Sequence, residues 1–123
     1  MQIMIKGKVK ICGKVVGVGF CPAASIAFYN YTGGVSVPQY LQELKDGKQD
    51  PSKALRLIMA AVFAYYDESG EELPVVDKDL IYGMGFQEAT TAFAKVLEMV
   101  NEYYTLPPNE QSEADNEKTE GKN

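Results

Sequence analysis

A run of thirteen residues in the middle of the chain, Ala54 to Tyr66, reads ALRLIMAAVFAYY and contains a single charge. Asp50-Pro51 supplies a helix start signal, because an Asp side chain accepts a backbone N–H bond at an N-cap and Pro is tolerated in the first turn. A helix that is apolar on nearly all sides must be surrounded by other elements. It is also shorter than the roughly 20 apolar residues that a bilayer requires. We therefore predict a central core helix.

The N-terminal residues predict a β-hairpin. From Ile3 to Ile11 apolar residues alternate with polar ones, the period of a strand with one apolar and one cationic face. Cys12-Gly13 is a short break, after which Lys14–Phe20 can pair back as a second strand. Lysines at alternate positions have two interpretations, contact with phosphate groups or protection of an outer strand against further pairing, and edge protection is common. The lysines concerned are Lys6, Lys8 and Lys10.

Capping and breaking signals predict further helices before and after the core helix. Their expected ranges are Pro22 to Thr32, closed by Gly33-Gly34; Ser36 to Asp46, opened by a Ser-Gln capping box; a short helix capped by Asp77 and broken by Gly83 and Gly85; and Gln87 to Tyr104. Asp67 to Glu72 is expected to form an acidic turn after the core helix. The predicted fold class is α+β, mainly α, with an N-terminal β-hairpin followed by about five helices packed around a central apolar helix.

The last predicted helix has an apolar stripe able to pack on the core helix or on another copy of the chain. Its rows are Phe86, Phe93 and Val100, and Ala89, Val96 and Tyr103. After this helix Pro107-Pro108 ends the periodic pattern, and residues 109–123 contain five acidic residues, two lysines and one Ala. Such a segment cannot bury enough surface to offset its ordering entropy. We expect residues 1–105 to form a single globular domain and residues 106–123 a disordered acidic tail.

Composition disfavours several classes of function. The formal net charge of -5 disfavours nucleic-acid binding, and the absence of His removes the commonest general base and metal ligand. Cys12 and Cys21 match no common zinc or redox spacing. Either could be a nucleophile, and Cys21 precedes a helix, but the chain has no His to activate them. The N-terminus lacks the pattern of a secretory signal. We expect a cytoplasmic protein that is not an enzyme, has reduced thiols, and uses no catalytic residue, cofactor, metal, nucleic acid or membrane.

For three other patterns, an ordinary structural explanation is better supported than a functional one. Gly13, Gly17 and Gly19 do not have G-x-G-x-x-G spacing, so a hairpin or bulge explains them better than a dinucleotide loop. The acidic turn lacks the ligand spacing of a calcium loop. Asp77 and Asp79 point apart on a helix, which makes them a poor acid and base pair.

Aromatic residues are the most suggestive feature for function, since the chain has eight Tyr and five Phe. Adjacent residues on a helix point about 100° apart, so the two members of a Tyr-Tyr pair face different surfaces. One member is expected in the core, and the other either anchors a partner or lies with its ring packed and its hydroxyl in water. The predicted partner-binding residues are Tyr65, Tyr66, Tyr82, Phe86, Met99, Tyr103 and Tyr104.

The order of these features resembles the tail assembly chaperones of long-tailed phages and prophages. The strand pair IKGKVKICGKVVGVGF, a helix ending in FYNYTGG, a small capped helix, LIMAAVFAYY, DLIYGM, a long amphipathic helix and an acidic tail follow in that order. The piece most typical of the family is Tyr31-Thr32-Gly33 followed by the apolar helix. The resemblance covers about residues 3 to 104.

The resemblance implies a non-enzymatic protein that binds the tape measure protein in the host cytoplasm, prevents its hydrophobic helices from aggregating, and gives way to tail tube protein. Such a chaperone is not expected in the mature virion. In many members a programmed ribosomal frameshift adds a C-terminal extension that recruits tube protein. Gly121-Lys122-Asn123 can be encoded GGA-AAA-AAC, which contains a slippery run, so our hypothesis is that this chain is the short, unshifted product. The alternative is a small structural or adaptor protein of virion morphogenesis that forms homo-oligomers through its last helix.

Overall fold

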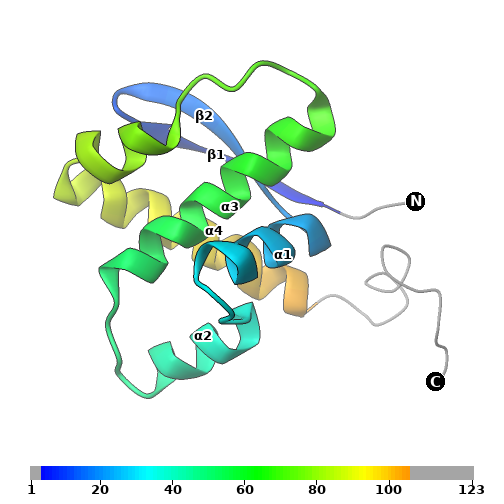
Figure 1. Cartoon of the computed structure of the whole chain (residues 1–123), viewed down its shortest axis with the longest axis vertical. Helices are drawn as coiled ribbons and strands as arrows, with labels where there is room; N and C mark the ends of the chain where they lie inside the picture. The colour runs from blue at the N-terminus through cyan, green and yellow to red at the C-terminus, as the bar shows by residue number, and fades with distance from the viewer. Residues whose placement is uncertain (1–3, 106–123) are drawn as a thin grey trace, which may run out of the picture.

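The computed structural model describes residues 4–105 of the 123-residue chain. Its elements are β1 (Ile5–Ile11), β2 (Lys14–Phe20), α1 (Pro22–Tyr31), α2 (Val37–Lys45), α3 (Pro51–Ser69), the π-helix η1 (Asp79–Gly83) and α4 (Phe86–Tyr104). The predicted fold class is confirmed: an α+β fold, mainly α, with an N-terminal antiparallel hairpin followed by five helices in the described part. In Figure 1, α3 crosses the front of the molecule, with the hairpin and α4 behind it. The tail predicted for residues 106–123 lies outside the described residues.

The central position predicted for the apolar helix is confirmed. Seven residues of α3 are buried: Leu57, Ile58, Met59, Ala60, Ala61, Val62 and Ala64. This helix packs against β2, α1 and α4, and its buried side chains belong to one continuous hydrophobic cluster with theirs. The Asp50 side chain accepts a hydrogen bond from the Lys53 N–H at 3.2 Å, as expected of an N-cap.

The acidic turn predicted at Asp67 to Glu72 begins too early. The helix α3 continues through Asp67 to Ser69 and ends only at Gly70, whose φ of 76° is left-handed and whose N–H donates to the Tyr66 carbonyl. Charged residues extend a helix readily when no breaker precedes them, and Gly is the residue that most easily adopts the left-handed closing conformation.

The predicted hairpin is confirmed, with Ile5 opposite Phe20 and Ile11 opposite Lys14. Cys12 and Gly13 form its turn with φ of 54° and 80°, the positive values of a two-residue turn that matches the strand twist. Glu88 at the start of α4 accepts hydrogen bonds from both turn amides, at 2.8 Å from Cys12 N and 3.0 Å from Gly13 N. A carboxylate 76 residues away therefore fixes the hairpin tip onto α4.

Gly17 allows α3 to approach β2 closely. A Cβ at this position would lie 2.5 Å from Cε1 of Tyr65, nearer than real contacts allow. The neighbouring Tyr66 hydroxyl accepts the Gly17 N–H at 3.0 Å. The glycine at this position thus serves a helix–strand contact, which agrees with the structural explanation favoured from the sequence.

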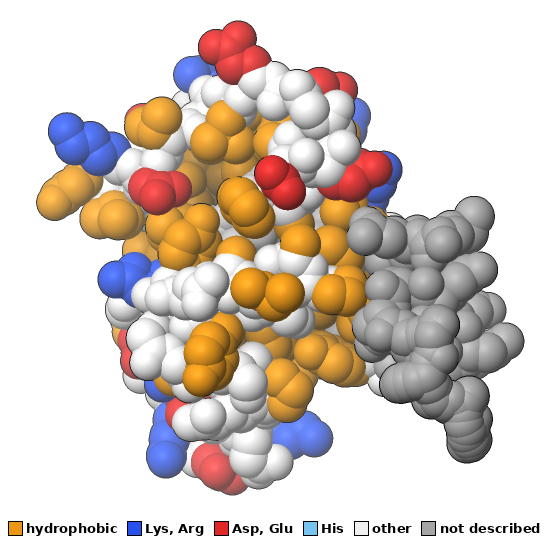
Figure 2. Space-filling model, turned by 45° about the vertical axis from the view of Figure 1, so that its right-hand side comes forward, with side chains coloured by type: hydrophobic (Ala, Val, Ile, Leu, Met, Phe, Trp, Pro, Cys, Tyr) orange, Lys and Arg blue, Asp and Glu red, His pale blue; other side chains and the backbone are white. Residues whose placement is uncertain are grey.

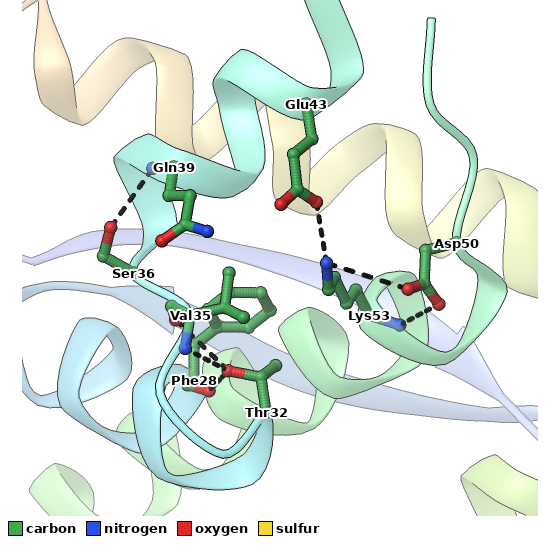
Figure 3. A network of polar contacts seen from close by, with 8 residues as sticks. All are labelled: Phe28, Thr32, Val35, Ser36, Gln39, Glu43, Asp50 and Lys53. Atoms are coloured by element: carbon green, nitrogen blue, oxygen red, sulfur yellow. Dashed lines mark hydrogen bonds and ion pairs between the residues drawn. The ribbon is translucent and has the colours of Figure 1, made fainter.

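Polar contacts connect α1, α2 and α3 at one end of the molecule (Figure 3). The Thr32 hydroxyl donates to the Phe28 carbonyl at 2.8 Å and accepts the Val35 N–H at 3.1 Å, closing the link between α1 and α2. Between α2 and α3, the Lys53 ammonium contacts a Glu43 oxygen at 2.7 Å and an Asp50 oxygen at 3.8 Å. The predicted Ser36 cap of α2 is confirmed by a 3.2 Å bond to the Gln39 N–H.

The short helix before α4 differs from its prediction. It is a π-helix, and the carboxylate that satisfies a backbone amide at its start belongs to Asp79, which accepts the Val76 N–H at 2.9 Å. Asp77, the predicted cap, is exposed. Asp79 can reach back because it lies three positions after Val76, a common spacing for a side chain that bonds its own turn.

Candidate partner-binding surface

The described residues contain little that is typical of a catalytic or metal site. Between residues 4 and 105 no group of three or more His, Cys, Asp or Glu side chains is placed to hold a metal ion. No helix in the same range is long and apolar enough to cross a bilayer. Cys12 and Cys21 are free thiols, and Cys21 is buried.

The surroundings of the exposed Cys12 thiol disfavour its ionisation. Its Sγ donates to the Asp79 carbonyl at 3.3 Å. The pKa of the Cys12 thiol is raised, mainly by partial loss of hydration and then by the negative charges of Asp79 and Glu88. Since the thiolate is the nucleophilic form, this environment disfavours the reactive thiol considered from the sequence.

Exposed apolar side chains are the main chemical feature of the surface. Figure 2 shows apolar side chains gathered over the middle of one face, with most charged side chains toward its periphery. The large exposed ones are Val15, Ile26, Tyr29, Phe63, Leu73, Val76, Ile81, Tyr82, Phe86 and Tyr104. Tyr82 and Phe86 are the most exposed, at 82% and 86%. Aromatic side chains left this open in a folded chain are characteristic of a surface that binds another protein.

The first of two apolar grooves, which we name the Phe86 groove, has a volume of about 460 Å³. It lies between α2, the start of α3, η1 and the start of α4, and most of its lining is apolar. The lining residues are Tyr40, Leu44, Gln49, Asp50, Pro51, Ala54, Leu55, Ile58, Leu80, Ile81, Met84, Gly85, Phe86, Ala89, Thr90 and Phe93. Phe86 stands at its edge because it is the first residue of α4, where no further helical turn covers it.

The second groove, the Phe63 groove, has a volume of about 380 Å³ and lies further along α3, beside its second half. It is formed by α3 and the segment that leads to η1. Its lining residues are Tyr31, Met59, Val62, Phe63, Tyr66, Asp67, Glu71, Leu73, Val75, Val76, Asp77 and Leu80. The buried Leu80 lines both grooves, so η1 separates them. Three carboxylates among the lining residues make this groove acidic.

The residues predicted to bind a partner fall into different environments. Tyr82 and Phe86 are exposed together at the junction of η1 and α4. Tyr66 is half-buried and lines the Phe63 groove, while Tyr65 packs edge-on against Tyr66 with ring centres 4.8 Å apart. Tyr104 is 38% exposed and lies at the opposite end of α4.

Met99 and Tyr103 do not belong to the exposed surface. They are only 1% and 6% exposed, because they share with Val96 and Val100 the face of α4 that packs on the hairpin and α3. The side chain of Met99 lies on Gly7, and the Tyr103 ring lies 5.3 Å from the Phe20 ring. Of the two roles left open for the apolar stripe, packing within the core is confirmed for Val96, Val100 and Tyr103, whereas Phe86 of the same stripe is 86% exposed.

The sequence prediction missed Phe63, Leu73, Val76 and Ile81, which line the two grooves and are between 41% and 56% exposed. A local signal existed for two of them, since Leu73 and Val76 flank Pro74 in an apolar stretch outside any predicted helix. Phe63 and Ile81 gave no such signal, because each lies within an apolar helical pattern whose exposed side depends on what packs against it.

Tyr40, which lines the Phe86 groove, gives this region a measurable pH dependence. Burial, and then the negative charges of Asp50 and Glu43, raise the pKa of Tyr40 from 10.0 to about 12. The folded state favours the neutral phenol. The stabilisation of the fold that this preference contributes is therefore fully present below pH 10 and is lost as the pH rises from 10 to about 12. The loss amounts to about 2 to 3 kcal/mol.

Urea unfolding at pH values below and above this range will test the Tyr40 prediction. The wild-type free energy of unfolding should fall more steeply than that of Tyr40→Phe, which has no phenol to titrate. The comparison cancels the effect of lysine deprotonation, which both proteins share. Parallel pH profiles for the two proteins would show that the Tyr40 hydroxyl is not held neutral by the fold.

No protein-family model matches the chain, and searches of the curated proteins and of the solved structures give no match either.

Proposed function

We propose that this chain is a non-enzymatic tail assembly chaperone of a long-tailed phage or prophage, which binds the tape measure protein in the host cytoplasm before tail tube protein takes its place. The observation that supports the proposal is the exposure of Tyr82 and Phe86, at 82% and 86%, beside an apolar groove. The family resemblance of the sequence supplies the identity of the client. The groove supplies a physical means of holding it.

The Phe86 groove suits an amphipathic helix as its ligand. Such a helix places the apolar side chains of one of its faces into a hydrophobic groove. The family resemblance implies a tape measure protein with long hydrophobic helices as the client. Burying one large apolar side chain at the edge, such as Phe86, contributes roughly 1.5 to 3 kcal/mol. Several such contacts would hold a client helix and cover the apolar surface through which it aggregates.

The charge around the grooves favours a client with basic residues on its flanks. Asp67, Glu71 and Asp77 line the Phe63 groove, and Asp50 lines the Phe86 groove. Carboxylates placed at the rim affect the rate and specificity of encounter more than the final affinity. We expect binding of a client with Lys or Arg beside its apolar face to weaken as salt is raised.

The alternative function, self-association through the last helix, has only part of its predicted stripe at the surface, where Phe86 is 86% exposed. Val96 and Val100 of the α4 stripe are fully buried in the chain's own core. A dimer built on that stripe would have to remove α4 from the hairpin and expose the core of each copy. We therefore favour a client-binding role on the exposed grooves.

Co-expression with a tape measure fragment from the same gene cluster tests the proposal. We expect the wild-type chain to keep the fragment in solution and to copurify with it. The double variant Tyr82→Ser with Phe86→Ser should weaken this binding at least about tenfold, because these are the two most exposed aromatic side chains beside the groove.

The double variant Ile26→Ser with Tyr29→Ser is the matched control. These side chains are 62% and 51% exposed on α1, outside both grooves, so their replacement removes similar apolar surface elsewhere. Equal loss of binding in the two double variants would contradict the assignment of the groove. A wild-type chain that leaves the fragment insoluble, or that polymerises alone, would contradict the chaperone function itself.

The gene supplies a separate test of the phage context. A tail tube gene upstream and a very long coiled-coil gene downstream are expected. Codons for Lys122-Asn123 should form the slippery run, with an overlapping frame beyond them. Codons without that run would remove the support for a short, unshifted product.

A further inference from the structure

A third groove runs along the outer edge of β1 on a different part of the molecule from the Phe86 and Phe63 grooves. Its volume is about 600 Å³, and it lies between the hairpin and the first half of α4. The lining residues are Lys8, Val9, Lys10, Val15, Gln87, Glu88, Thr91, Ala92 and Lys95. Three of them are lysines, and both oxygens of its one carboxylate already bind the hairpin turn. The groove is therefore cationic.

The backbone of β1 faces this groove with unpaired groups. The Gly17 N–H donates to the Tyr66 hydroxyl, so it points away from β1, and Gly17 with Lys8 is a non-hydrogen-bonded pair of the hairpin. Because such pairs alternate with hydrogen-bonded ones, the N–H and C=O groups of Lys6, Lys8 and Lys10 point outward from the edge. The sheet has two strands in the described part of the chain, so no strand covers this edge there.

The side chains of the same lysines are exposed and available for pairing. Lys6 has two weak contacts, with a Glu68 oxygen at 3.9 Å and with the Tyr65 ring, whose centre lies 6.0 Å from Nζ. Lys8 and Lys10 have no ion pair among residues 4–105. An unpaired edge with a cation at every second residue fits an extended segment with an acid at every second residue.

The chain contains one segment with that pattern. Residues 113–117 read EADNE, so Glu113, Asp115 and Glu117 would lie on one face of an extended chain. Their spacing equals that of Lys6, Lys8 and Lys10. We infer that residues 113–117 add to the outer edge of β1 as a third strand, with their carboxylates opposite the lysines.

The path of α4 brings the segment to the correct end of β1. Glu88 at the start of α4 binds the hairpin turn, Met99 lies on Gly7, and the Tyr103 ring lies beside Phe20, which is paired with Ile5. The helix therefore runs antiparallel to β1 and ends near Ile5. Residues 106–112 can span about 23 Å, enough for the chain to reverse and run parallel to β1 with Glu113 nearest Lys6 and Glu117 nearest Lys10.

Docking of residues 113–117 would give the lysines of β1 a binding role in addition to the protection of the strand edge. Ala, Asp, Asn and Glu are weak strand formers, so the third strand depends on the lysine charges and on its attachment to α4, which keeps its local concentration high. It would cover an edge that otherwise invites pairing with other chains. The inference rests on residues outside the client grooves and goes beyond the proposed function.

Amide hydrogen exchange by NMR on the full-length protein, at low ionic strength, tests the inference. In the wild type, the amides of Lys8 and Lys10 should exchange about tenfold more slowly than in the double variant Asp115→Asn with Glu117→Gln. The double variant Glu110→Gln with Glu120→Gln removes the same charge outside residues 113–117 and should exchange like the wild type. Salt near 1 M, where the screening length is about 3 Å, should remove the difference.

The lysine side of the pairing gives an independent measurement. Lys8→Gln with Lys10→Gln should shift the amide resonances of Asp115 and Glu117, whereas Lys45→Gln with Lys48→Gln, also exposed, should not. Fast exchange of Lys8 and Lys10 in every variant would overturn the inference. Equal loss of protection in both acidic double variants would overturn the pairing of alternate acids with alternate lysines. Protection that increases with protein concentration would mean that the third strand comes from a second copy of the chain.

Discussion

Replacing Ala61 with Asp is expected to unfold the protein. Ala61 is fully buried in the middle of α3, the helix that packs against β2, α1 and α4. An unpaired carboxylate there costs more than about 4 kcal/mol, and even its neutral form is too large for a site packed around a methyl group. Domains of this size are stable by only about 5 to 15 kcal/mol, so most of the folding free energy is lost.

Far-UV circular dichroism and a thermal melt will measure the Ala61→Asp effect. The matched control is Ala94→Asp, since Ala94 is exposed on α4 and undergoes the same change. That control should cost less than about 1 kcal/mol, mainly through the lower helix propensity of Asp. A cooperative melt for Ala61→Asp at the same temperature as Ala94→Asp would contradict the central position of α3.

Truncating Phe20 to Ala is expected to cost about 3 to 5 kcal/mol. The Phe20 side chain is fully buried at the end of β2, where its ring centre lies 5.3 Å from that of Tyr103 and 6.0 Å from that of Tyr104. Its loss leaves a cavity between the hairpin and α4 that these larger rings cannot fill without leaving their own contacts. The melting temperature should fall by more than about 10 °C.

The control for Phe20→Ala is Tyr82→Ala, which removes an aromatic ring that is 82% exposed. Its free energy of unfolding should stay within about 0.5 kcal/mol of the wild type. The same measurement on Tyr82→Ser with Phe86→Ser will show whether that variant is folded when its client binding is assayed. Similar melting temperatures for the two Ala variants would mean that Phe20 does not join the hairpin to α4.

Elements whose signals are local were predictable. The hairpin follows from alternation around Cys12-Gly13, α2 from the Ser36 cap, and α3 from its Asp50 cap and apolar run. Each depends on residues within one or two turns of each other, where capping and periodicity act. The fold class followed from these elements, and so did the central place of α3, because a helix that is apolar on nearly all sides has no stable position at the surface.

The candidate site depended instead on contacts between distant residues. Phe86 and Val100 belong to the same predicted row, yet Phe86 is 86% exposed and Val100 is fully buried, because the hairpin and α3 enclose Val100 and leave the first residue of α4 outside. Met99 is buried for the same reason. The sequence by itself determined the elements, their caps and the apolar core helix. Only the tertiary structure decided which aromatic side chains stay outside, that Glu88 fixes the hairpin turn, and that four elements enclose the Phe86 groove, because these follow from packing between segments far apart in the chain.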